Sequence, residues 1–167
     1  NSGWMEPFYT DKASPLKPLV ANLASAVAGR DEVVVGLFNQ ADEVHLSPEW
    51  IYRGPGGGAG LGQALAGAGL VRKQSGAYAD TDFKEALLGA IKQGLGNQSG
   101  IVWIVTNNKN SPNNSDAVIA RNREFYELLH GEGVIPRIAA FPFKSSVQGE
   151  HYRANGLMIY AIAYGQP

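Results

Sequence analysis

The sequence has 167 residues, which suits one domain of ordinary size, and 44% of them are hydrophobic while 17% are charged. This balance allows a buried core and excludes an intrinsically disordered chain. The formal net charge is −1, so no basic surface for nucleic acid is expected. No apolar run reaches the roughly 18 residues of a membrane span, so we expect no membrane insertion by this domain. Cysteine is absent, which excludes disulfides and zinc sites built on cysteine.

The first predicted elements are a helix and a strand. A helix is expected from about Pro15 to Gly29, because its leucines and valines recur at helical spacing. The stretch EVVVGLF (32–38) is apolar almost without alternation, which is typical of a strand covered on both faces. A shorter strand candidate, EWIYRG, follows at residues 49–54.

Residues 54–62 have the sequence GPGGGAGLG, for which two interpretations stay open. The backbone N–H groups of such a loop can surround a phosphate at a helix N-terminus, which would suit a nucleotide- or phosphate-binding α/β enzyme. However, no Gly-Lys-Ser/Thr ending follows, so a Walker-type loop is excluded. The favoured interpretation is a surface connection that leads into a short helix over Leu61 to Ala68.

The second half of the chain alternates helices with buried strands. Asp82 is predicted to cap a helix that runs to about Leu95, with Glu85 three residues after the cap. Another helix is expected to begin at Ser115 or Asp116 and to end at Gly131. Strands are predicted at 101–106, 134–141 and 156–164, and a polar loop at 144–155. This alternation predicts an α/β fold with a Rossmann-like open, mainly parallel sheet flanked by helices.

No group of residues in the sequence indicates catalysis. The three histidines, His45, His130 and His151, lack the spacing of a metal site, and no G-x-S-x-G elbow is present. The acidic pairs at 31–32 and 42–43 flank a predicted strand, where charges usually mark solvated ends. We therefore expect no catalytic residue and no enzyme activity.

The chain opens with NSGWM, which resembles the x-S-G-S-M part of a metal-binding motif with tryptophan at the second serine. Three further stretches carry a similar resemblance: DEVVVGLFN, the threonine loop in YADTDFKEAL, and IVWIVTNNKNS with Asn107 in place of an aspartate. Together with the order of elements along the whole chain, these stretches resemble the von Willebrand factor A domain family. The resemblance implies a protein-interaction or adhesion-type domain without catalytic activity, with ligand contacts at the carboxyl edge of the sheet.

In that family the loops at the carboxyl ends of the strands form an adhesion site for Mg²⁺ or Mn²⁺. The resemblance implies Ser2, Thr81 and Asn107 as ligands of a degenerate site, because these residues offer oxygen atoms at the matching positions. The family's first aspartate would precede Asn1, and the indole of Trp4 offers no oxygen. A tight metal site is therefore not expected, with at most weak binding of Mg²⁺ or Mn²⁺, and Trp4 is predicted to contact a protein partner instead. A metal-dependent adhesion domain completed by an upstream aspartate remains the alternative.

The resemblance also implies a central strand between residues 32–38 and 101–106 that would lie upstream of Asn1. We therefore expect residues 1–167 to be a single domain excised from a longer polypeptide. The habit of the family favours a larger bacterial protein and an extracytoplasmic location, either periplasmic or at the cell surface.

Overall fold

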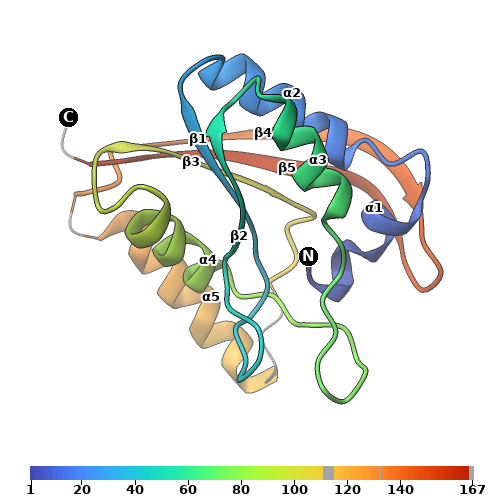
Figure 1. The fold of residues 1–167 in the computed structure, drawn as a ribbon. Helices are drawn as coiled ribbons and strands as arrows, with labels where there is room; N and C mark the ends of the chain where they lie inside the picture. The colour runs from blue at the N-terminus through green and yellow to red at the C-terminus, as the bar shows by residue number, and fades with distance from the viewer. Residues whose placement is uncertain (111–114, 132, 166–167) are drawn as a thin grey trace.

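The computed structural model describes residues 1–110, 115–131 and 133–165. In these residues, five strands form two separate antiparallel sheets (Figure 1). The smaller sheet pairs β1 (Glu32–Leu37) with β2 (Glu49–Pro55). The larger sheet has the order β3-β5-β4 and consists of β3 (Gly100–Thr106), β4 (Arg137–Gln148) and β5 (Arg153–Tyr164).

The helices cover both faces of the three-stranded sheet. In Figure 1, α4 and α5 lie on one side of this sheet and α2 lies on the other, while the β1-β2 hairpin passes in front. In chain order the helical elements are the 3₁₀ turn η1 (Gly3–Met5), α1 (Glu6–Thr10), α2 (Leu16–Ala28), α3 (Ala59–Gly67), α4 (Phe83–Gly89), the π-helical turn η2 (Ala90–Gly94) and α5 (Ser115–His130).

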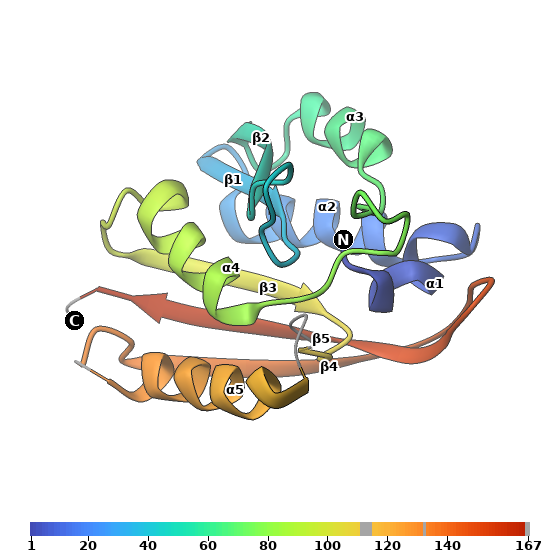
Figure 2. The ribbon, with the colours of Figure 1, turned by 90° about the horizontal axis from the view of Figure 1, so that it is seen from below.

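The buried side chains form three clusters. One cluster, around Leu87 and Ile162, lies between the three-stranded sheet and the helices α4 and α5. A second, around Phe8 and Leu157, joins α1 and α2 to the opposite face of that sheet. The third, around Leu61, joins the β1-β2 hairpin to α2 and α3. The hairpin is thus attached to the molecule through helix packing and not through pairing with β3 (Figure 2).

The predicted positions of most elements are confirmed. Strands occur at all five expected places, and helices occur at the four expected places. The cap at Asp82 is also confirmed, since its carboxylate accepts a hydrogen bond from the backbone N–H of Glu85 at 3.1 Å. Apolar spacing and capping residues act over a few neighbouring residues, so they predict the positions of helices and strands along the chain well.

The predicted parallel, Rossmann-like sheet is wrong, and so is the resemblance to the von Willebrand factor A family. Every strand pair in the described sheets is antiparallel. Long apolar runs do not determine the direction of neighbouring strands. Nor do they guarantee burial: residues 137–142 of β4 are exposed and no residue of β1 is fully buried, so the prediction of strands covered on both faces is wrong for these two. The loop predicted at 144–155 is wrong as well, because β4 and β5 continue through it as one hairpin.

The turn of this long hairpin is held by a buried carboxylate. Glu6 is fully buried, and its carboxylate accepts hydrogen bonds from the backbone N–H groups of Glu150 at 2.6 Å, His151 at 3.4 Å and Tyr152 at 3.3 Å. Gly149 allows this approach, since an added Cβ there would lie 2.1 Å from a carboxylate oxygen of Glu6. A charged acceptor shared by several N–H groups gives a strong tie between the start of the chain and the hairpin.

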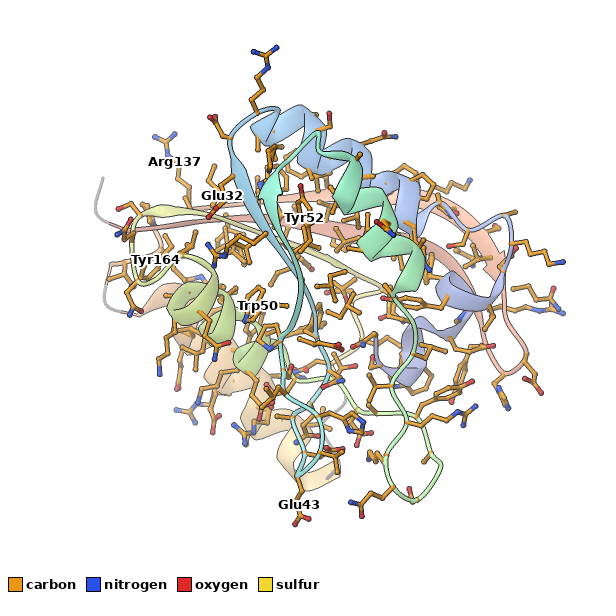
Figure 3. All side chains as sticks on the ribbon, viewed as in Figure 1. Glu32, Glu43, Trp50, Tyr52, Arg137 and Tyr164 are labelled. Atoms are coloured by element: carbon orange, nitrogen blue, oxygen red, sulfur yellow. The ribbon has the colours of Figure 1, made fainter. Side chains whose placement is uncertain are left out.

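Replacing Glu6 should destabilise the protein. We expect Glu6→Ala to lower the free energy of unfolding by about 3 kcal/mol, because backbone N–H groups of the turn lose their acceptor. Urea denaturation followed by circular dichroism measures the change. Glu43→Ala is the matched control, since Glu43 is exposed at the tip of the loop after β1 and points away from the molecule (Figure 3). Equal stabilities of the two variants would contradict the role of Glu6.

Candidate functional site

A cleft of about 740 Å³ lies between the two sheets. Each residue from Glu32 to Phe38 lines one wall, and each residue from Gly100 to Thr106 lines the opposite wall. Successive side chains of a strand point to opposite faces, so a cavity lined by every residue in turn runs along the strand edges. In the described sheets β1 pairs only with β2, and β3 pairs only with β5. The cleft therefore separates two strand edges that have no strand neighbour.

Asn1 lies at the end of the cleft where β1 and β3 finish (Figure 1). Its α-amino group donates a hydrogen bond to the carbonyl oxygen of Phe38, the first residue after β1, at 2.8 Å. Its own carbonyl oxygen accepts from the backbone N–H of Val71 at 3.2 Å. Asn1 is only 7% exposed, and this burial lowers the pKa of its α-amino group from the ordinary value of 8.0 to about 5.

The structure brings together two of the three residues that the resemblance implied as metal ligands. The hydroxyl of Thr81 donates to the hydroxyl of Ser2 at 2.5 Å, and both side chains are buried beside Asn1. Asn107 has other partners: its side-chain amide donates to the carbonyl oxygen of Trp4 at 2.6 Å, and its side-chain oxygen accepts from the N–H of Lys109 at 3.2 Å. In the part of the chain that the structure describes, no group of three His, Cys, Asp or Glu side chains is placed to hold a metal. Binding of Mg²⁺ or Mn²⁺ at these residues stays a prediction.

Two buried polar residues around this pair, Asn39 and Thr106, were missed by the sequence reasoning, and Asp82 was predicted only as a helix cap. Asn39 is the second residue after β1, Thr106 ends β3, and both are 2% exposed. Asp82 is fully buried, and one of its oxygens makes no hydrogen bond among the described residues but lies 3.6 Å from Nε of Arg121. The sequence signal that could have found them is a polar residue at or just after the end of an apolar strand. Such residues lie close together when the strands end at the same side of the molecule.

Trp4, the predicted partner contact, belongs to a row of rings and cations. The ammonium of Lys109 lies 4.3 Å from the centre of the Trp4 ring, and the Tyr152 ring lies 4.8 Å from it. His151 continues the row toward Tyr78, at 6.1 Å between ring centres. At the far end, the guanidinium of Arg72 lies 4.1 Å from the centre of the Tyr78 ring. We call this set the Trp4 surface; its residues are Trp4, Arg72, Tyr78, Lys109, His151 and Tyr152.

The glycine-rich run packs the β1-β2 hairpin against α2. The N–H of Gly56 donates to the carbonyl oxygen of Asp31 at 3.1 Å, and the N–H of Gly57 donates to that of Gly29 at 2.8 Å. A Cβ added at Gly56 would lie 2.3 Å from the carbonyl oxygen of Ala24, so the close approach to the helix needs glycine there. These N–H groups are already bonded within the chain, which favours the interpretation of this run as a structural connection.

Comparisons with known proteins find no match to this chain among family models, curated proteins or solved structures. Across residues 1–110, 115–131 and 133–165, none of the helices combines the length and apolar character that a membrane span needs. The cleft and the Trp4 surface are therefore the features from which we infer a function.

The buried amino terminus makes stability depend on pH. For a polypeptide of residues 1–167 with a free α-amino group, stability should be complete above pH 8 and fall as the pH decreases toward 5. In this window the unfolded chain binds a proton that the folded chain does not, because burial lowers the pKa of the Asn1 amine to about 5. The loss should approach about 4 kcal/mol, at 1.36 kcal/mol per unit of pKa.

Acetylation of the α-amino group of Asn1 supplies the control for this measurement. The acetylated chain cannot bind the proton, while its histidines and carboxylates titrate as in the free chain. Urea denaturation between pH 5 and 8 should therefore show a steeper pH dependence for the free amine. Identical profiles for the two chains would show that the amine is not buried.

Proposed function

We propose that this chain is a non-catalytic protein-interaction domain that binds its partner through the Trp4 surface. The observation that carries the proposal is the continuous row of rings and cations formed by four separate segments of the chain. Tryptophan, tyrosine and arginine are the residue types that most often dominate the binding energy of protein interfaces. Their assembly from distant segments gives the fold a surface that the isolated segments lack.

The rings and cations of this surface are held in place before any partner arrives. The carbonyl oxygen of Trp4 is fixed by Asn107, and the backbone of Tyr152 is fixed by Glu6. Lys109 and Arg72 lie over aromatic faces, which limits the rotamers that binding must still order. Such pre-organisation lowers the entropic cost of association.

The charges of the Trp4 surface favour a partner segment in which an acidic side chain adjoins an apolar or aromatic one. Among the described residues, neither Lys109 nor Arg72 forms an ion pair with a carboxylate. A partner carboxylate can therefore pair with them without displacing an ion pair among the described residues, although the guanidinium of Arg72 also donates to the carbonyl oxygen of Gly76 at 2.7 Å. Complementary charge of this kind contributes to the association rate and to specificity.

Substitution of Trp4 tests the proposal. A partner captured from extracts of the source cells is first identified and purified, and its Kd is then measured by calorimetry. We expect Trp4→Ala to weaken binding by about 30-fold, the effect of losing an interface hot spot. Lys109→Glu should also weaken binding and should reduce its dependence on salt, because an attractive charge pair becomes repulsive.

Tyr126→Ala is the matched control, since Tyr126 is an aromatic residue on α5 with 61% of its surface exposed. This variant should bind the partner as tightly as the unchanged protein. Circular dichroism of all three variants excludes loss of folding as the cause. Undiminished binding by both Trp4→Ala and Lys109→Glu would contradict the proposal.

A further inference from the structure

The cleft between β1 and β3 has the length and the walls that one additional β-strand would need. Its walls are strands of six and seven residues, so a strand of about the same length would span it at about 3.3 Å per residue. Figure 1 shows the two walls running obliquely to each other, with their carboxyl ends on the side where the amino terminus lies. An oblique relation between strands on either side of a vacant position agrees with the twist that every sheet accumulates.

Helices close the cleft on its two remaining sides. Leu23 and Val27 of α2 line one side, and Ala86 of α4 and Ala90 of η2 line the other. A strand in this position would be covered on both faces, so its side chains would be apolar almost throughout. The walls themselves are rich in valine and isoleucine, which pack well against such a strand.

The edges that face the cleft differ from the outer edge of the larger sheet. The edge strand β4 contains Pro142, Lys144 and a shift of register, features that prevent another strand from pairing with an exposed edge. The sequences of β1 and β3 contain neither proline nor lysine. Backbone N–H and C=O groups buried without a partner each cost about 1–3 kcal/mol, so both edges favour occupation by a further strand.

Asn1 indicates which polypeptide occupies the cleft. Its nitrogen already donates a hydrogen bond to the carbonyl oxygen of Phe38, the first residue after β1. A residue of a strand paired with an extension of β1 would make the same hydrogen bond. A peptide N–H at this position would make the same bond and would leave no ionisable amine in a buried site, where the charged form is costly. A polypeptide that extends from the nitrogen of Asn1 would therefore enter the cleft beside β1.

We propose that the polypeptide on the amino side of Asn1 forms a strand that fills the cleft, pairing with β1 along one edge and with β3 along the other. This strand joins the two sheets into one and replaces the buried α-amino group of Asn1 by a peptide bond. The inference stands independently of the proposed function, because it depends on the cleft and not on the Trp4 surface.

Hydrogen exchange in the protein isolated from its source cells tests the proposal. Intact mass and peptide mapping should show residues that precede Asn1. The amides of β1 and β3 should exchange about as slowly as those of the central strand β5, because both of their edges are then paired. Residues of the exposed edge of β4 supply the fast reference within the same molecule. A chain that begins at Asn1, or edge amides of β1 and β3 that exchange as fast as that reference, would overturn the proposal.

A second measurement adds a strand deliberately to residues 1–167. Seven residues of valine, isoleucine and threonine are placed before Asn1, and the control carries prolines at its two central positions, which lack the N–H for pairing. The strand should slow exchange in β1 and β3 by about tenfold or more relative to the control and should raise the melting temperature. Equal behaviour of the two chains would overturn the proposal. If residues 1–167 sediment as a dimer in which the edges of β1 and β3 exchange slowly, a second copy of the chain occupies the cleft. That result would also overturn the proposal.

Discussion

Buried backbone N–H and C=O groups need hydrogen-bond partners, and this requirement organises the whole molecule. The three-stranded sheet satisfies it by pairing β5 on both edges. The turn of the β4-β5 hairpin satisfies it through the carboxylate of Glu6, and the glycine-rich connection satisfies it through carbonyl oxygens near the end of α2. At the cleft between β1 and β3, two strand edges face each other without a strand neighbour among the described residues, and the cleft adjoins the buried amino group of Asn1.

The first six residues connect the two features to which we assign a function. Asn1 closes one end of the cleft, Trp4 lies in the row of rings, and Glu6 anchors the turn that carries Tyr152. A strand in the cleft would therefore restrain the same short segment that presents Trp4. Residues 1–6 therefore link the conformation of the sheets at the cleft to that of the Trp4 surface.

The resemblance to the von Willebrand factor A family shows what short local motifs can and cannot predict. The hydroxyls of Ser2 and Thr81 meet, and the side chain of Asn107 donates to the carbonyl oxygen of Trp4, but neither contact tests metal binding. Yet the described sheets are antiparallel, and β5 lies between β3 and β4. A short polar motif describes the loop that contains it, whereas the direction of strands depends on connections made elsewhere in the chain.

The sequence by itself determined where helices and strands lie, because side-chain burial, glycine stops and caps such as Asp82 act over a few neighbouring residues. It did not determine how deeply the strands are buried: no residue of β1 is fully buried, and buried residues alternate with more exposed ones along β3. Only the tertiary structure decided which strands pair and in which direction, brought Glu6 to the hairpin turn, and assembled the Trp4 surface. The reason is physical: strand pairing uses backbone groups that nearly all residues share, so their partners are selected by the packing of the entire chain and not by local composition.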